Sequence, residues 1–380
     1  MSGDLGIGAA VVHGTVAEMS DAAEKPSQGR ARDRSMRSVE DRASKAESEQ
    51  QSREPGRSVF DRFRDLKRDR IQLGSVTYRL RRHVGGQSGE RAGKNETFEA
   101  TRDGDDAQVV FVKRFRRPKF PTEQFESESP HDASTARASC DTFERRHKAV
   151  MGRLADDGVG AGALIKPIDF GREAGGVSFV KVYPFVADAK VATHVELRRW
   201  DQATRRRFVV TLLLAVRQLH RVGVVHGDLK TDNILVVERP IGPVARLVDF
   251  DDAYTTDAPP TDVRDIGVTI LTPEIQVMVG AAGSWPEQLP LGTGCDMFQL
   301  GVVLHQLLST SGGLPSYETA DDFEGDAADA VLKGIRLEYG DLGVGSPHFS
   351  WLCRKTLEVR PEHRPSIEQL LSALAVKVPS

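Results

Sequence analysis

Two short stretches of this 380-residue sequence carry side chains of the kind that phosphoryl transfer needs. In the first, Asp228 and Asn233 are five residues apart, with Lys230 between them. The second ends an apolar run with Asp249, sixteen residues after the asparagine. The reaction requires one carboxylate to orient the acceptor hydroxyl, a second carboxylate and an amide oxygen to hold Mg²⁺ against the phosphates, and a cation near the transferred group. Asp228 fits the first role and Lys230 the last. Asp249 and Asn233 fit the metal site.

Five motifs that include these residues follow one another along the chain. They are His226-Gly227-Asp228 for His-Arg-Asp, Asp249-Phe250-Asp251 for Asp-Phe-Gly, Thr272-Pro273-Glu274 for Ala-Pro-Glu, Asp296 with Leu300-Gly301, and His363-Arg364-Pro365-Ser366. One tripeptide is a weak signal, whereas five matches in the right order are specific. On these residues, the sequence from about 75 to 375 resembles the eukaryotic-like serine/threonine protein kinases found in bacteria.

The resemblance implies both a fold and an activity. The fold is α+β and bilobal, with a five-stranded antiparallel N-lobe and a mainly helical C-lobe. The activity is Mg²⁺-dependent transfer of the γ-phosphate of ATP to Ser or Thr hydroxyls of a protein substrate. In this family the Asp of the helix motif braces the catalytic loop, so Asp296 is expected to hold the loop that contains Asp228. The late Arg pairs with the glutamate of Ala-Pro-Glu, so Glu274 and Arg364 are expected to form a buried ion pair.

The ATP site implied by the resemblance is assembled from the first lobe. Lys113 ends the stretch Val-Phe-Val-Lys, which resembles the strand whose lysine contacts the α- and β-phosphates. Gly86 and Gly89 lie where a glycine-rich loop would approach the phosphates. Phe185 lies in the connector between the lobes, where the adenine is expected to pack.

A helix glutamate that pairs with the strand lysine is also implied. Glu144 is the acid nearest to the right place in the helical stretch 135–154, and we predict that it pairs with Lys113. The apolar spacing of that stretch through Met151 and Leu154 instead aligns His147 with the family's glutamate position.

Two departures from the family pattern carry predictions. Gly227 replaces the Arg that meets a phosphate on the activation segment, so activity is expected without phosphorylation of that segment. Asp251 replaces the Gly of Asp-Phe-Gly. It either joins the Mg²⁺ site or caps the following turn.

Two other functions share some of these features. Small-molecule kinases of the aminoglycoside and choline phosphotransferase type have the same Asp-to-Asn spacing, but Lys230, Glu274 and Arg364 favour a protein kinase. A pseudokinase scaffold would bind a nucleotide or a partner without transfer, and the irregular glycine loop keeps this alternative open. Transfer of a labelled γ-phosphate discriminates the three functions.

The elements that must position these residues follow from local patterns. Alternating apolar residues and turn signals predict strands at 75–84, 96–101, 107–115, 164–170 and 177–186. Helical spacing predicts helices at 135–154, 201–222, 296–308, 327–335, 348–357 and 366–375, with a loop at 118–134. Strands followed by helices indicate two lobes, at 75–186 and 187–378.

Composition bounds the remaining classes of function. The chain has 52 basic and 55 acidic residues, a balance that argues against a nucleic-acid or membrane-surface binder. Its 3 cysteines are too few for a disulfide framework or a zinc site, which fits a cytoplasmic protein. No Phe, Trp or Tyr precedes Phe60. We therefore predict a disordered tail at 1–57 and a short linker helix at 58–74.

Overall fold

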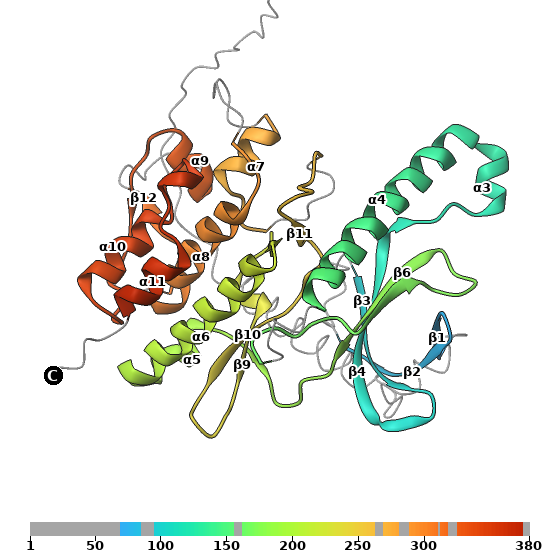
Figure 1. Cartoon of the computed structure of the whole chain (residues 1–380), viewed down its shortest axis with the longest axis horizontal. Helices are drawn as coiled ribbons and strands as arrows, with labels where there is room; N and C mark the ends of the chain where they lie inside the picture. Colours follow the sequence, from blue (N-terminus) through green and yellow to red (C-terminus); the bar gives the residue numbers. More distant parts are fainter. Residues whose placement is uncertain are drawn as a thin grey trace, which may run out of the picture. The chain divides into compact units, whose positions relative to one another are not determined.

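Strands within residues 70–83, 95–119 and 169–184 form one antiparallel sheet (Figure 1). The computed structural model describes residues 69–84, 95–155, 162–262, 269–280, 289–310, 312–317 and 325–374, all of them in the unit Phe63–Ser380. The strands are β1 (Arg70–Leu73), β2 (Val76–His83), β3 (Asn95–Arg102), β4 (Asp105–Lys119), β5 (Asp169–Arg172) and β6 (Ser178–Pro184). Their order across the sheet is β1-β2-β3-β4-β6-β5.

The two faces of this sheet pack against different groups of side chains. Successive residues of a strand point to opposite faces, so Val110 and Val112 share one face of β4 while Lys113 and Phe115 share the other. Val110 and Val112 are buried with side chains of β1, β2, β3 and β6 in an apolar cluster. Phe115 packs with Phe179 and a cysteine of the neighbouring helix. The lysine therefore lies on the face that the helix covers.

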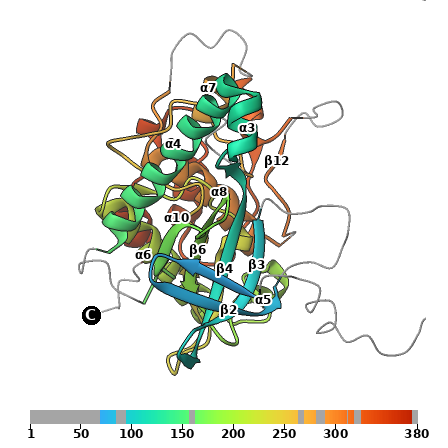
Figure 2. The same cartoon turned by 90° about the vertical axis from the view of Figure 1, so that its right-hand side faces the viewer.

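That helix is α4 (Pro130–Leu154), which runs beside β4 (Figure 2). Its buried residues recur at steps of three, four and seven, which places them on one face: Ala133, Cys140, His147, Val150 and Leu154. A short helix, α3 (Glu123–Glu128), precedes it, and its N-cap Thr122 accepts a hydrogen bond from the Phe125 backbone N–H.

The second lobe is mainly helical (Figure 1). Its helices are α5 (His194–Arg198), α6 (Gln202–Arg221), α7 (Pro273–Met278), α8 (Thr293–Leu308), α9 (Ala327–Leu332), α10 (Pro347–Lys355) and α11 (Ile367–Leu374), with 3₁₀ turns at Thr231–Asn233 and Pro361–His363. The Asp201 carboxylate caps α6 by accepting from the Thr204 N–H at 2.7 Å. Helices α6, α8, α10 and α11 enclose the largest apolar core.

Short strands pair with one another between the helices of this lobe. They are β7 (Lys190–Val191), β8 (Val224–Val225), β9 (Ile234–Val237), β10 (Val244–Leu247), β11 (Tyr254–Thr255), β12 (Ser316–Tyr317) and β13 (Leu337–Glu338). The hairpin β9–β10 joins the two acidic motifs, and β11 pairs with β8. This pairing places the stretch after Asp249 beside the loop that contains Asp228.

The predicted α+β, bilobal fold is confirmed, with differences in detail. The sheet has six strands rather than five, because Arg70–Leu73 pairs with β2. This stretch lies within the range predicted as a linker helix at 58–74, so the helical prediction is wrong there. The rest of that range, and the predicted tail at 1–57, lie outside the described residues. The predicted loop at 118–134 contains α3 and the start of α4. In the described part of the chain, no helix is long and apolar enough to cross a bilayer.

Candidate active site

Two side chains of helix α8 form hydrogen bonds with the backbone of the loop that follows β8. The buried Asp296 carboxylate accepts hydrogen bonds from the backbone N–H groups of His226 and Gly227 at 2.8 and 2.9 Å. Gln299 accepts from the Leu229 N–H at 2.9 Å and donates to the Gly227 carbonyl at 2.9 Å. These side chains satisfy the backbone of an irregular segment that would otherwise be buried without partners. The loop is therefore rigidly placed, as the motif at Asp296 predicted.

Gly227 has a backbone conformation that suits glycine. Its φ is +77°, and a Cβ at this position would lie 2.7 Å from the carbonyl oxygen of Asp252. The absence of a side chain therefore permits the close approach of the loop to the segment that follows Asp249.

Asp228, Lys230 and Asn233 form one hydrogen-bonded group. Asp228 Oδ2 accepts from Lys230 Nζ at 2.7 Å and from Asn233 Nδ2 at 3.4 Å. Asp228 Oδ1 accepts from the Thr269 backbone N–H at 2.8 Å, and Lys230 also donates to the Thr269 hydroxyl at 2.7 Å. The structure thus brings together the three residues predicted to be catalytic. It adds Thr269, which the sequence reasoning did not assign to the site.

Asp249 lies two residues after the end of β10 and lines the same cleft as Asp228. It is one of two described residues other than glycine with a positive φ, at 67°. Such a conformation is unfavourable for an aspartate and is found mainly where a site requires it. Its Oδ1 accepts from Lys113 Nζ at 2.6 Å. The strained backbone therefore delivers the carboxylate to the strand lysine predicted to bind ATP phosphates.

The residues predicted to hold Mg²⁺ fit that ion chemically. Asn233 Nδ2 donates to the Asp228 carbonyl at 2.8 Å, which leaves its amide oxygen as the atom for a metal. Asp249 supplies a carboxylate, and both are hard oxygen donors of the kind that Mg²⁺ prefers. Among the described residues, no group of three or more His, Cys, Asp or Glu side chains could hold a metal ion. A kinase-type magnesium site does not need such a group, because phosphate oxygens and water complete it.

The partner of Lys113 is the main correction to the predicted site. Lys113 is 8% exposed and donates to Asp249 Oδ1 and Asp251 Oδ2, both at 2.6 Å. Glu144 instead pairs with Lys148 at 2.5 Å, one turn along the outer face of α4. The prediction that Glu144 pairs with Lys113 is therefore wrong.

His147 occupies the helix position that faces the sheet. Its ring is 2% exposed and lies 4.1 Å from the ring of Phe143 and 4.8 Å from that of Phe170. Burial and the nearby ammonium of Lys181 hold the pKa of His147 well below its usual range, so the ring is neutral. The apolar spacing that aligned His147 with the glutamate position was thus the correct guide to the helix face.

Asp251 forms ion pairs with two lysines of the sheet. It lies 2.6 Å from Lys113 and 3.2 Å from Lys181, a fully buried lysine on β6. Burial opposes ionisation of Asp251, but attraction to Lys113 and Lys181 holds the pKa of its carboxyl well below the usual range. Sequence reasoning missed Lys181. The signal for it is a single lysine inside the apolar run from Phe179 to Tyr183.

Of the remaining residues predicted to bind ATP, the structure describes Phe185 but not the two loop glycines. Gly86 and Gly89 lie outside the described residues. Phe185 is half-buried and directly follows β6, and its backbone N–H donates to the Val109 carbonyl at 3.4 Å. It therefore lies in the connector between the lobes, as predicted.

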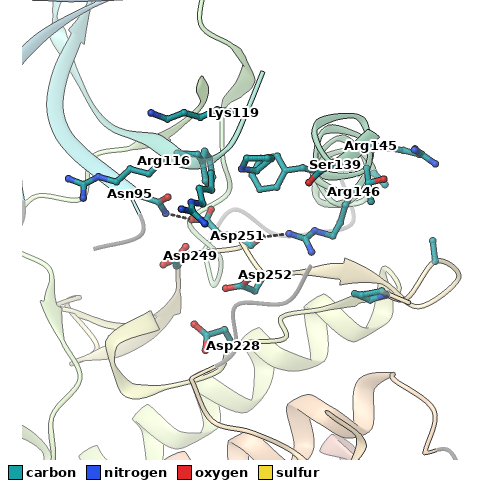
Figure 3. Close-up of a pocket in the computed structure, with 18 of the residues that line it drawn as sticks. Asn95, Arg116, Lys119, Ser139, Arg145, Arg146, Asp228, Asp249, Asp251 and Asp252 are labelled. Carbon is teal, nitrogen blue, oxygen red and sulfur yellow. Dashed lines mark hydrogen bonds between the residues drawn. The ribbon is translucent and has the colours of Figure 1, made fainter. Parts of the chain in front are cut away.

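A cleft of about 2040 Å³ opens beside these residues. Figure 3 shows Asp228, Asp249 and Asp251 along it, with Arg146 on α4 pointing toward Asp251. Arg146 donates to the backbone carbonyl of Asp251 at 3.3 Å, and Asn95 donates to its side chain at 3.2 Å. Acidic groups from the catalytic loop and from the segment after β10 thus share one open space.

The predicted ion pair between Glu274 and Arg364 is present. The two guanidinium NH₂ groups of Arg364 donate to the two carboxylate oxygens of Glu274 at 2.6 and 3.2 Å. Both side chains are at most 1% exposed. Three backbone carbonyls, at Gly294, Glu358 and Val359, accept the remaining donors at 2.6–2.9 Å. The pair therefore fixes the end of the activation segment, at α7, to the segment before α11.

Comparison with known families and structures identifies the family and the fold. The family model described as "Protein kinase domain" matches residues 168–374, more than half of the chain. The kinase PK-1 of the Cydia pomonella granulovirus has a similar structure, with a TM-score of 0.50 and 17% sequence identity over 78% of this chain and 93% of that one. At this identity the likeness shows the fold alone.

Curated relatives include protein kinases from bacteria and animals. "Serine/threonine-protein kinase pkn3" of Myxococcus xanthus is 29% identical over 225 residues, 57% of this chain and 36% of its own length. "Serine/threonine-protein kinase nekl-2" of Caenorhabditis elegans is 30% identical over 167 residues, 43% of this chain and 41% of its own. The chain thus spans less than half the length of these relatives. With the family match, the fold and the ordered catalytic groups, the chain belongs to the protein kinase domain family.

Proposed function

We propose that this protein transfers the γ-phosphate of ATP to Ser or Thr hydroxyls of a protein substrate, with Mg²⁺ as cofactor. The observation that carries the proposal is the single hydrogen-bonded group of Asp228, Lys230 and Asn233 on one side of the cleft. Asp249 also lines the cleft and pairs with the strand lysine Lys113 at 2.6 Å. Phosphoryl transfer depends mainly on positioning and charge stabilisation, which such a fixed array of charges provides.

Each residue then has a defined task. Asp228 accepts a hydrogen bond from the acceptor hydroxyl and orients it, because its carboxylate is held at both oxygens by Lys230 and the Thr269 N–H. Lys230 also faces the transferred phosphoryl group and screens its charge. Lys113 binds the α- and β-phosphates. Asp249 and Asn233 would hold Mg²⁺, which would supply charge neutralisation at the phosphates.

One feature favours a protein acceptor over a small molecule. The activation segment contributes Thr269 to the Asp228 group and ends at the buried Glu274–Arg364 pair. This feature supports the protein kinase over the aminoglycoside and choline kinase type.

Incubation with γ-labelled ATP, Mg²⁺ and a generic protein acceptor tests the proposal. We expect label in phosphoserine or phosphothreonine after acid hydrolysis, and none when EDTA removes the metal. Label that appears only in a small-molecule acceptor would assign the chain to the small-molecule kinases. ATP binding without any transfer would assign it to the pseudokinase scaffolds.

Phosphorylation of the activation segment is not expected to be required. Gly227 has no side chain to receive a phosphate, and the segment is already held by the β8–β11 pair and by Thr269. Thr256 and Thr261 are the exposed hydroxyls of the described segment that lie outside the Asp228 group. The Thr256→Ala/Thr261→Ala variant should keep its transfer rate within about twofold of wild type, as mutations outside the transition-state contacts do. A hundredfold loss in steady-state rate would contradict this expectation.

A further inference from the structure

Two lysines face each other across neighbouring strands in the core of the ATP site. Lys113 on β4 and Lys181 on β6 are directly paired in the sheet register. Lys113 is 8% exposed, and Lys181 is 0% exposed. Like charges directly opposite one another in a sheet repel, and a buried ammonium needs a compensating charge. The sheet therefore requires an acid at this place.

Asp251 supplies that acid from the activation segment. Its Oδ2 lies 2.6 Å from Lys113 Nζ, and its Oδ1 lies 3.2 Å from Lys181 Nζ. The Asn95 amide and the Tyr183 hydroxyl donate to the same carboxylate at 3.2 and 3.4 Å. Each carboxylate oxygen is thus bonded to an ammonium group and to one neutral donor. This arrangement suits an anchor for the lysines better than a ligand of Mg²⁺.

The backbone around Asp251 is fixed as well. Lys181 donates to the Phe250 carbonyl at 3.0 Å, and Arg146 donates to the Asp251 carbonyl at 3.3 Å. Asp251 is not among the described residues with a positive φ, so its conformation does not demand the glycine of the family pattern. The segment that carries the acid is therefore held by Lys181 of β6 and by Arg146 of α4, the second of which Figure 3 shows.

Helix α4 offers no acid to replace it. The buried position that faces Lys113 and Lys181 is the neutral His147, and Glu144 is paired with Lys148 on the outer face. The charges that fix the ATP lysine thus come from Asp249 and Asp251 rather than from the helix.

We propose that Asp251 is the positioning residue for Lys113 and that Lys181 holds Asp251 in place for this task. The inference rests on the proposed kinase function, because Lys113 acts on ATP phosphates there. It means that correct placement of the lysine depends on the activation segment and not on the position of a helix glutamate. It also removes Asp251 from the predicted Mg²⁺ ligands.

Kinetic coupling between Asp251 and Lys113 tests the proposal. Asp251→Asn should lower kcat about 10- to 100-fold, the effect typical of misplacing a catalytic group. In a Lys113→Met background, where single-turnover rates with labelled ATP are measured, Asp251→Asn should cause no further loss. Losses that multiply would overturn the proposal, because a Mg²⁺ ligand or an independent role acts without the lysine. Glu144→Ala is the matched control and should keep both kcat and the KM for ATP.

Thermal unfolding provides a readout that does not need transfer. Asp251→Asn removes the carboxylate that the two opposed ammonium groups share, while Asp249 still pairs with Lys113, so the melting temperature should fall by several degrees. Adding Lys181→Met removes one of these ammonium groups and should restore part of the loss. A double variant that melts at or below the temperature of Asp251→Asn would contradict the arrangement. If wild type shows no transfer, the proposed function fails, whereas this unfolding cycle still decides whether Asp251 compensates the two lysines.

Discussion

Replacing Asp249 by asparagine should lower the rate of phosphoryl transfer by about a thousandfold. The change keeps the size of the side chain but removes the negative charge that pairs with Lys113 at 2.6 Å and that is proposed to bind Mg²⁺. Removing a single group that stabilises transition-state charge costs about 10²–10³-fold in kcat, and here the metal is weakened as well. Single-turnover transfer of labelled phosphate at saturating ATP measures the effect.

The control for this variant is another acid of the same segment. Asp257 is exposed and pairs with Arg153 at 2.7 Å, outside the cleft. Asp257→Asn should transfer phosphate at the wild-type rate. If Asp249→Asn retained wild-type turnover, its assignment as a metal ligand would be refuted.

Removing the carboxylate of Glu274 should destabilise the fold by about 3–5 kcal/mol. Glu274→Ala leaves the guanidinium of Arg364 buried with backbone carbonyls but without a counter-charge. The loss is large because the charge cannot be solvated in place, whereas an exposed pair is screened by water. Chemical denaturation of wild type and variant measures the free energy of unfolding.

A double variant separates the buried charge from the lost contacts. Glu274→Leu/Arg364→Met removes both charges and keeps apolar volume, so it should lose less stability than Glu274→Ala alone. A single variant within 1 kcal/mol of wild type, by the same denaturation measurement, would show that the pair does not stabilise the lobe.

Contiguous motifs in the sequence predicted the catalytic loop well, because its geometry is local. Asp228, Lys230 and Asn233 lie within six residues and share one loop, so their proximity follows from spacing alone. The anchors at Asp296 and Arg364 were also predicted, but only because the family pattern links them to distant motifs.

The partner of Lys113 could not be predicted in the same way. It depends on the register between β4 and β6, on the rotation of α4 and on the path of the segment after Asp249. Each of these is a tertiary property. A three-residue shift along α4 separates the outward Glu144 from the inward His147. The acid nearest in sequence was therefore the wrong partner.

Strand β1 and helix α3 were missed for a different reason. The four residues of β1 alternate between exposed and buried, but they follow a highly charged stretch and are too few for a clear period. In α3 the described residues include no buried side chain, so a helical apolar stripe is absent. Both elements are stabilised by their neighbours, through pairing with β2 and packing against α4.

The most direct test of the central claim compares wild type with Asp228→Ala under γ-labelled ATP, Mg²⁺ and a protein acceptor. Asp228 is the group proposed to orient the acceptor hydroxyl, and its loss leaves the ion pair of Lys113 with Asp249 intact. Exposed Glu362, outside the cleft, provides the control variant Glu362→Ala. We predict labelled phosphoserine or phosphothreonine with wild type and with the control, and none above background with Asp228→Ala. Equal labelling by wild type and Asp228→Ala, or no labelled protein with wild type, would contradict the assignment of this chain as an active protein kinase.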